Sequence, residues 1–432
     1  MNHIVSQMLI YGRNNEGEIL SSLSDIFKKY NDGGYDRDEL VKRTYEQISR
    51  ILVLSTDCGF DENLWHCYLS YILVTDENPF SLTCEKKGSG QGSVNAFARQ
   101  DFRCFKALFD YDFSNFERDL GIGCFSVISR YRALEKPAFM FNKNVSEKVK
   151  ALSRELEGAA DENEFFEIVT VFYKKYGVGM FGLNKAFRVE TGNGVSFKPI
   201  NNMDTVTLCD LVGYETQKEK LLENTCAFVE GKKANNVLLF GDSGTGKSTS
   251  IKAIVNQFYD EGLRMIEIYK HQFKHLSDVI ARIKNRNYKF IIYMDDLSFE
   301  EFETEYKFLK AVIEGGVETK PDNILIYATS NRRHIIKEVW SDRDDVEQKA
   351  GIHRSDTMEE KLSLVNRFGV TISYSKPTQK EFFEIVIELA RREGINLSDE
   401  ELMDGANRWE LSHGGISGRT ARQFVTHLLG TR

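Results

Sequence analysis

Hydrophobic and polar positions follow different periods in the two parts of this chain. Up to about residue 180, apolar residues recur every three or four positions, as Tyr45, Ile48 and Ile51 do. This is the spacing of an amphipathic helix, so the pattern predicts a mainly helical N-terminal region. The expected helices span 16–30, 37–54, 62–74, 98–134, 144–157 and 162–176.

Two segments depart from the helical pattern. The stretch CEKKGSGQGS, from Cys84 to Ser93, is rich in glycine. No strand precedes it and no lysine follows at the right place, so it predicts a mobile surface loop and not a phosphate loop. In the segment from Lys185 to Ile200, apolar and polar residues alternate on both sides of a turn at Gly192–Gly194. This pattern predicts a β-hairpin.

After about residue 204, short apolar runs alternate with amphipathic stretches. Strands alternating with helices indicate a parallel sheet with helices on both faces, here followed by a helical lid. The expected strands are 236–240, 264–269, 289–294, 323–329 and 369–374, the helices between them 247–260, 276–286 and 302–314, and the lid helices 378–393, 398–410 and 417–429. The predicted parts are a helical domain 1–180, a hairpin or linker 181–204, an α/β core 205–376 and a lid 377–432.

Composition narrows the class of protein. The 432 residues suggest two or three domains. With 41% hydrophobic and 28% charged residues the balance is ordinary, and the net charge of -8 excludes an overall basic coat for nucleic acid, though a local basic patch stays possible. Seven cysteines without a C-x-x-C pair favour reduced thiols. Neither a leader peptide nor a membrane span is visible, so we expect a cytoplasmic protein with no membrane partner.

The strongest motif is NVLLFGDSGTGKST, from Asn236 to Thr249, which contains G-x-x-x-x-G-K-S. A buried strand leads into it and a helix follows, which is the context of a phosphate loop, or Walker A motif. Its glycines let backbone N–H groups converge on phosphate, Lys247 adds a point charge, and the Ser248 hydroxyl suits magnesium. The predicted nucleotide-binding residues are Gly241, Asp242, Ser243, Gly244, Thr245, Gly246, Lys247, Ser248 and Thr249.

A second acidic motif lies in YKFIIYMDDLSFE, from Tyr288 to Glu300, where an apolar strand ends in two carboxylates. This is a Walker B pattern. Asp295 is expected to hold Mg²⁺ together with Ser248, and Asp296 to orient or activate the attacking water. An aspartate reaches less far than a glutamate, so hydrolysis is expected to be slow or gated, and Glu300 is the alternative for activating water.

With these motifs placed, the chain resembles the AAA+ ATPases. LVGYETQKEKL, from Leu211 to Leu221, is similar to the segment that lines the adenine pocket, and implies base contacts for Val212, Gly213 and Tyr214. IYATSN is similar to the sensor 1 strand and implies that Asn331 senses the γ-phosphate, in preference to Thr329 and Ser330.

The same resemblance implies roles for two arginines. LVNRFGV is similar to an arginine-finger segment and implies that Arg367 acts on a neighbouring subunit's nucleotide. GISGRTARQF is similar to sensor 2 and implies that Arg419 acts in cis, with Arg422 as the alternative. Either arginine could instead be a surface or capping residue.

The phrases GKKANNVLLFGDSGTGKS, DDLSFE, ATSNRRH and GRTARQF are closer still to one bacterial AAA+ family, catalogued as domain of unknown function 815. The AAA+ part covers about 205–432, and YGVGMFGLNKAFRV upstream is also similar to that family. The resemblance implies ATP and Mg²⁺ as ligands and a homo-oligomer, transient or formed with ATP.

Three segments leave alternatives open. IYKHQFKHLSDV, from Ile268 to Val279, lacks the aromatic–hydrophobic–glycine triplet of protein-threading machines, which weakens an unfoldase interpretation. Its basic and aromatic residues could contact nucleic acid, but an amphipathic helix start with Phe273 and Leu276 packed inward is favoured. Arg332 and Arg333 are more consistent with surface residues than with contacts to a neighbour. The charged stretch 341–360 suits a solvated loop better than one that responds to a partner.

The sequence therefore predicts an AAA+ ATPase that hydrolyses Mg-ATP at subunit interfaces and remodels an unidentified protein or nucleic-acid partner. A nucleic-acid-acting ATPase such as a helicase loader is the first alternative, and the acidic net charge counts against it. A weakly hydrolysing nucleotide switch or adaptor is the second, because Asp296 stands where many relatives have glutamate.

Overall fold

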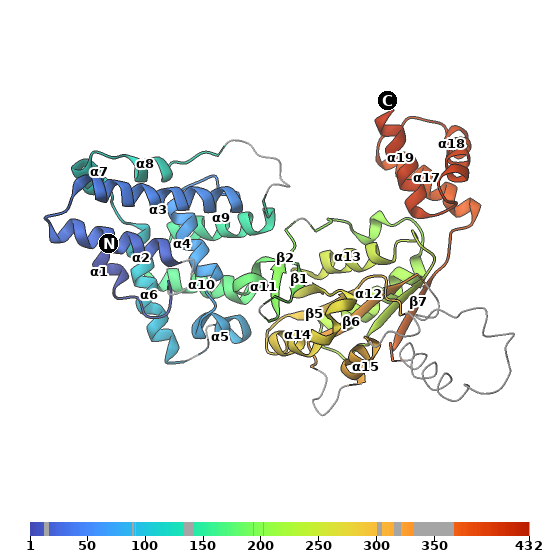
Figure 1. Ribbon diagram of the computed structural model, residues 1–432, viewed down its shortest axis with the longest axis horizontal. Helices are drawn as coiled ribbons and strands as arrows, with labels where there is room; N and C mark the ends of the chain where they lie inside the picture. The colour runs from blue at the N-terminus through green and yellow to red at the C-terminus, as the bar shows by residue number, and fades with distance from the viewer. Residues whose placement is uncertain are drawn as a thin grey trace. The chain divides into compact units, whose positions relative to one another are not determined.

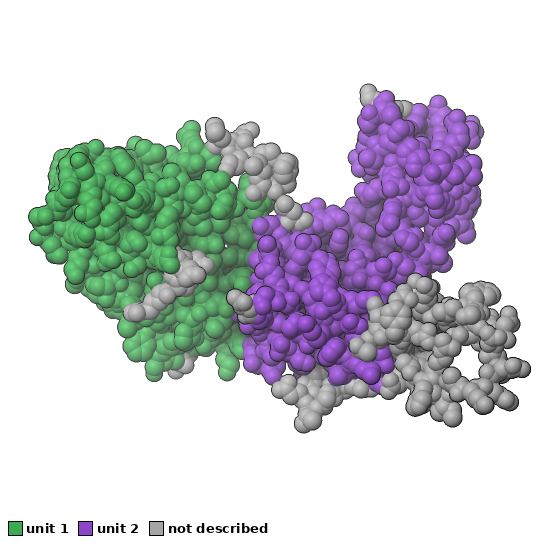
Figure 2. All heavy atoms as spheres, in the orientation of Figure 1, with its two compact units in different colours: residues 1–184 green, residues 185–432 purple. Residues whose placement is uncertain are grey.

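A computed structural model describes residues 1–12, 17–88, 90, 92–133, 141–192, 194–201, 203–299, 305–314, 321–331 and 367–431. The chain forms two compact units, Met1–Asn184 and Lys185–Arg432, which Figure 2 shows in green and purple. Within the described ranges, no helix is both long enough and apolar enough to cross a membrane.

The first unit is helical, as predicted (Figure 1). The helices expected from the spacing of apolar residues are present, with ends shifted by a few residues. For example, α3 begins after Asp36, whose carboxylate accepts N–H bonds from Asp38 and Glu39, and it ends at Gly59, which has a φ of 71°. The helices are α1 Asn2–Val5, α2 Glu18–Asp32, α3 Arg37–Cys58, α4 Leu64–Thr75, α5 Pro79–Lys87, α6 Val94–Phe109, α7 Ser114–Leu120, α8 Cys124–Ile128, α9 Lys143–Glu157, α10 Glu162–Tyr176 and α11 Gly179–Leu183.

The prediction of one helical stretch over 98–134 was wrong in its continuity. Three helices occupy the described part of this region, because polar groups and a glycine interrupt the helical backbone between them. Asp112 accepts the backbone N–H of Ser114 at 2.9 Å and starts α7. Gly121 ends α7 with a φ of 62°, a conformation that most residues with a side chain avoid.

The predicted loop over 84–93 was wrong in its first four residues. They are the last residues of α5, and Cys84 is buried in the core of the unit. The helix ends where Gly88 takes a φ of 71° and its N–H bonds to the carbonyl of Cys84. The glycines predicted the stop correctly, but the helix extends up to them.

Buried carboxylates in the helical unit bind backbone N–H groups. Asp101 is fully buried and accepts N–H bonds from Leu9, Ile10 and Tyr11 at 2.7, 2.7 and 2.9 Å. Glu117 likewise accepts the N–H of Phe125 at 2.7 Å at the start of α8. These carboxylates supply partners for backbone groups that no helix satisfies.

The second unit contains a seven-stranded sheet in the order β2-β1-β4-β5-β6-β3-β7. All neighbours are parallel except β1 and β2. The five strands expected from the apolar runs are confirmed, and so is the predicted α/β class with helices on both faces. The strands are β1 Ala186–Glu190, β2 Ser196–Pro199, β3 Val237–Gly241, β4 Leu263–Glu267, β5 Lys289–Met294, β6 Ile324–Ser330 and β7 Val370–Tyr374.

Helices cover the sheet on two sides. Apolar residues of α12 and α13 pack on the face that carries Leu239, Tyr293 and Tyr327, whereas Figure 1 shows α14 and α15 on the opposite face. The helical segments of this part are η3 Leu208–Asp210, α12 Glu215–Val229, α13 Lys247–Phe258, η4 Lys270–His275, α14 Leu276–Ile283 and α15 Tyr306–Glu314. Phe273 and Leu276 are buried, which confirms the amphipathic helix start preferred for this segment.

The predicted hairpin is present, but its place in the sheet was not foreseen. β1 pairs antiparallel with β2 and also parallel with β4, with Ala186 opposite Met265. The hairpin therefore extends the sheet beyond β4.

The lid consists of α17 Gln379–Arg392, α18 Asp399–Ser412 and α19 Gly418–Gly430, with a core of its own. Capping boxes begin α17 at Thr378 and α18 at Ser398, and the hydroxyl of Ser417 caps α19. The predicted C-terminal helical lid is confirmed.

Strand order determines which loops meet. β5, β6 and β3 are neighbours and parallel, with Met294 opposite Ala328 and Phe240 opposite Ser330. Their carboxyl ends therefore open at one edge of the sheet, where parallel α/β sheets place their ligands.

Candidate functional site

The phosphate loop joins the end of β3 to the start of α13, and two of its glycines have no room for a side chain. A Cβ on Gly241, at a φ of 130°, would fall 2.1 Å from the carbonyl oxygen of Tyr374 in β7. A Cβ on Gly246, at a φ of 93°, would fall 2.5 Å from a methyl carbon of Leu211. Gly241 is thus required by packing against backbone as well as by its conformation, whereas Gly246 is favoured chiefly by its conformation, because the leucine side chain can move.

Lys247 begins α13 and is buried. Its Nζ donates to the carbonyls of Gly241 and Asp242 at 3.0 and 2.6 Å and to Oδ1 of Asn331 at 3.0 Å. Burial lowers the pKa of Lys247, although the nearby carboxylates of Asp242, Asp296 and Asp295 oppose this shift. The ammonium group thus lies where the loop, β3 and β6 converge.

Asp295 follows β5, and one of its oxygens collects three hydroxyl groups. Oδ1 accepts hydrogen bonds from Ser248 at 2.8 Å, Tyr293 at 2.7 Å and Thr329 at 2.6 Å. Burial disfavours the charged carboxylate, but these bonds and the N–H of Asp296 outweigh it, so the pKa of Asp295 lies below its usual value. Asp295 is therefore a carboxylate at neutral pH.

Tyr293 and Thr329 were not predicted as part of this arrangement. Tyr293 precedes Asp295 by two residues, and strand side chains alternate, so the period alone places both on one face. Thr329 was weighed only as a phosphate sensor. The sequence gives no direct sign that its hydroxyl would reach across to β5.

Asp296 has an unusual backbone conformation, with a φ of 49°. Its N–H donates to Oγ1 of Thr329 at 3.0 Å, and its Oδ1 accepts Nδ2 of Asn331 at 2.8 Å. Since Asn331 also accepts a bond from Lys247, one amide links the lysine to the second carboxylate.

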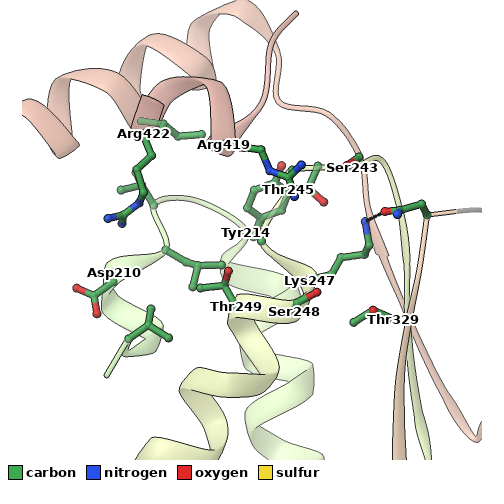
Figure 3. Close-up of a pocket in the computed structure, with 18 of the residues that line it drawn as sticks. Asp210, Tyr214, Ser243, Thr245, Lys247, Ser248, Thr249, Thr329, Arg419 and Arg422 are labelled. Carbon is green, nitrogen blue, oxygen red and sulfur yellow. Dashed lines mark hydrogen bonds between the residues drawn. The ribbon is translucent and has the colours of Figure 1, made fainter. Parts of the chain in front are cut away.

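These residues line one cavity of about 570 Å³ (Figure 3). Of the residues predicted to bind nucleotide or metal or to act on phosphate, those lining it are Val212, Tyr214, Ser243, Gly244, Thr245, Gly246, Lys247, Ser248, Thr249, Asp295, Asp296, Asn331 and Arg419. Gly213, Gly241, Asp242 and Arg367 are not among the lining residues. Lining residues not singled out from the sequence are Val206, Asp210, Leu211, Ile385, Leu389 and Gly418, together with Thr329 and Arg422, which were alternatives.

Part of the cavity wall is aliphatic. Val206, Leu211, Val212, Ile385 and Leu389 supply aliphatic walls there, from the segment before α12 and from lid helix α17. Such a slot suits the flat face of a nucleobase.

Tyr214 closes this segment with a φ of 62°. Its hydroxyl donates to the carbonyl of Ser375 at 2.9 Å, and its ring lies 5.2 Å from that of Tyr374. Burial raises the pKa of Tyr214 to about 12. The ring is thereby fixed against the end of β7, beside the cavity.

The lid reaches the phosphate loop through the start of α19. The N–H of Arg419 donates to the carbonyl of Gly244 at 3.1 Å. In Figure 3 the Arg419 side chain points toward Ser243 and Thr245, whereas Arg422 extends toward the segment of Asp210. In addition, Nη1 of Arg392 donates to the carbonyl of Cys209 at 2.8 Å. Lid and core are thus joined at both ends of the cavity.

Arg367 lies elsewhere, just before β7. It is half-buried, and its neighbour Phe368 is buried. Its predicted role on another subunit stays a prediction. Glu300, Arg332, Arg333 and the stretch 341–360 lie outside the described residues.

The donor set of the site suits magnesium. The Ser248 hydroxyl and the Asp295 carboxylate are hard oxygen donors, lie 2.8 Å apart and face the same cavity as Lys247. Mg²⁺ prefers one or two carboxylates together with phosphate oxygens and waters. The residues therefore fit a magnesium ion bound together with phosphates.

Comparison with known proteins adds a family. The model of the family Protein of unknown function (DUF815) matches residues 183–432. The RuvB Holliday junction branch migration motor of Thermotoga maritima is similar in structure, at 17% identity over 52% of this chain and a TM-score of 0.36. The FIGL-1 AAA domain in complex with ADP is similar at 18% identity over 52% of this chain, with the same TM-score of 0.36.

The match to RuvB spans 64% of that protein's chain, and the match to FIGL-1 spans 73% of its chain. No curated protein matches the sequence. The sheet order and the phosphate loop described above give the second unit a P-loop α/β fold.

Proposed function

The chain belongs to the family Protein of unknown function (DUF815), and for this member we propose an ATPase that binds Mg-ATP and hydrolyses it at the interface between subunits, in order to remodel a partner. One observation carries the proposal. Lys247, Ser248 and Asp295 line a single cavity to which the lid and the segment before α12 add aliphatic surface.

Each part of the site matches one part of the nucleotide. The aliphatic slot takes the adenine, and the loop N–H groups and Lys247 take the phosphates. Ser248 and Asp295 hold the magnesium ion, which shields phosphate charge when it is bound. The backbone N–H of Arg419 bonds to the loop, which supports a role for this residue in adding positive charge from the lid.

Asp296 is the residue proposed to accept a proton from the attacking water. Asn331 holds its carboxylate at 2.8 Å and is itself bonded to Lys247. A γ-phosphate that accepts from Lys247 therefore competes with Oδ1 of Asn331 for the same ammonium group, which couples nucleotide binding to the freedom of Asp296.

Arg367 supplies the proposed link between subunits. It does not line its own cavity, as a finger acting on a neighbour's phosphate would not. Such arginines raise turnover by a factor of about 10³ or more in other P-loop enzymes.

The test is the ATPase rate per subunit as a function of protein concentration, for the wild type and Arg367→Ala. We expect the wild-type specific rate to rise with concentration. Arg367→Ala is expected to stay low at every concentration while it still binds ATP.

Arg391→Ala serves as the control, because Arg391 is exposed at the end of α17 and bonds only locally to Glu388. It should follow the wild type. A specific rate that is flat with concentration and insensitive to Arg367→Ala would reject the shared site.

A weakly hydrolysing nucleotide switch is the second candidate function. It is favoured by one observation: the short Asp296 side chain is held by a hydrogen bond from Asn331. Asp296→Asn separates the two. If turnover falls by about 100-fold, Asp296 acts as the base. If turnover is low already and does not change, the chain is better described as a switch.

A further inference from the structure

Asp295 is surrounded by more hydroxyl groups than a phosphate loop followed by an acidic strand end needs in order to bind nucleotide and magnesium. Besides Ser248 of the loop, Tyr293 from β5 and Thr329 from β6 both donate to the same oxygen, at 2.7 and 2.6 Å. Both are only 1% exposed, so packing on the α13 face restricts their side chains.

The direction of these bonds follows from proton counting. Oγ1 of Thr329 accepts the N–H of Asp296 at 3.0 Å, so its own hydroxyl proton is left for Asp295. Oδ1 of Asp295 therefore accepts three hydrogen bonds, and the lone pairs that remain free on the carboxylate lie on Oδ2.

A carboxylate fixed in this way cannot turn about its χ2 without losing three hydrogen bonds. Asp295 itself is exposed toward the cavity, so its own surroundings would not otherwise hold it. Prior ordering of a ligand group removes the entropy cost of ordering it when the ion binds.

We propose that Tyr293 and Thr329 are positioning residues that orient the Asp295 carboxylate, through its Oδ1, for the magnesium ion bound with the nucleotide. The proposal rests on the proposed function, since it assumes that Asp295 serves the metal. It assigns to these two residues a role that is separate from folding and from contact with phosphate.

The main test is Tyr293→Phe, which removes a single oxygen atom. Binding of N-methylanthraniloyl-ADP is followed by fluorescence, first in EDTA and then with MgCl₂ titrated. We expect the half-saturating Mg²⁺ concentration to rise about 10-fold, since loss of a group supporting a metal ligand has effects of this size. Affinity in EDTA should change by less than about twofold, because no nucleotide contact is lost.

Tyr327→Phe is the matched control. Tyr327 lies directly opposite Tyr293 in the register of β5 and β6 and is also buried, but its hydroxyl bonds to Thr225 at 2.8 Å, away from the cavity. It should leave the Mg²⁺ dependence unchanged. Thr329→Val is the second variant and should raise the Mg²⁺ requirement, whereas Thr329→Ser, which keeps the hydroxyl, should restore it.

The outcomes are distinct. If wild-type binding depends on Mg²⁺ and Tyr293→Phe behaves as Tyr327→Phe does, the positioning role is overturned and the proposed function stands. A Tyr293→Phe protein with equal losses in EDTA and in Mg²⁺ also overturns it, because the role would then be structural. If the wild type binds the labelled ADP with no Mg²⁺ dependence, the proposed use of Asp295 fails, and this inference fails with it.

Discussion

The two units use hydrogen-bonded acidic side chains in different ways. In the helical unit, Asp101 is enclosed and its two oxygens accept three backbone N–H groups. In the α/β unit, Asp295 receives three hydroxyls on one oxygen and faces a cavity with the rest of the carboxylate. The first carboxylate completes the backbone, whereas the second keeps bonding capacity available. A carboxylate whose oxygens are all hydrogen-bonded thus indicates a role in stability, whereas one with an oxygen still free to bind indicates a role in function.

The largest expected effect tests that criterion directly. Asp101→Ala removes the acceptor of three N–H groups, one of them buried and two partly buried, so we expect the helical unit to lose about 4 kcal/mol of unfolding free energy. Asp295→Ala should cost less, about 1 kcal/mol, because the carboxylate faces the cavity and water can take its place beside the hydroxyl groups. Calorimetry that resolves the two unfolding transitions measures both.

Nucleotide binding is the complementary readout for the same pair. At a temperature where Asp101→Ala is folded, it should bind labelled ADP as the wild type does, and Asp295→Ala should lose the dependence on Mg²⁺. Equal stability losses for the two variants would break the comparison.

The second prediction concerns the phosphate loop. Gly241→Ala drives a Cβ into the carbonyl of Tyr374, which can be relieved only by moving β3 from β7. We expect a loss of about 3 kcal/mol in the α/β unit, compared with about 1 kcal/mol for Gly231→Ala. Gly231 has a φ of 79° with open space around it and isolates the conformational cost.

Denaturant unfolding of the two glycine variants gives the difference. Similar midpoints for both would show that β7 yields easily at this point. The loop would then be less rigid than its packing indicates.

The smallest effect is a pH dependence that belongs to the helical unit. Burial lowers the pKa of His66, although its bond to the carbonyl of Phe109 and the nearby Glu157 oppose the shift. Below the ordinary histidine pKa of about 6.5 the unfolded chain therefore binds more protons than the folded one. The contribution of His66 to the stability of this unit is therefore fully present above that pH. It declines as the pH falls, by at most about 1.4 kcal/mol per pH unit.

His66→Phe keeps the stacking on Phe109 and removes the titration. The stability of the helical unit should become flatter between about pH 5 and 7, and the exposed His3→Phe serves as the control. An unchanged slope in His66→Phe would assign the pH dependence to another group.

The sequence predicted much of the α/β unit because its signals are local. The phosphate loop, with Lys247 and Ser248, is a contiguous motif, and Asp295 ends an apolar run. The strands expected around them are confirmed. The roles predicted for Asn331, Arg367 and Arg419 stay predictions.

What the sequence did not predict depends on pairing between distant segments. Thr329 meets Asp295 only because β5 and β6 are neighbours in one register. The pairing of β1 with β4 joins residues 79 positions apart, such as Ala186 and Met265, which no local pattern encodes. In the helical unit, the breaks after Phe109 and Leu120 had local signals in Asp112 and Gly121, but the apolar spacing continued through them and hid the ends.

The hairpin at the edge of the sheet has a practical consequence for fragments of this protein. A fragment that starts at residue 205, where the strand–helix pattern begins, would lack β1 and β2 and leave the edge of β4 open over Met265–Glu267. Open strand edges recruit other chains and cause aggregation. β2 ends in Pro199, which has no N–H to offer a further strand. A fragment that begins at Lys185 keeps this natural terminator of the sheet.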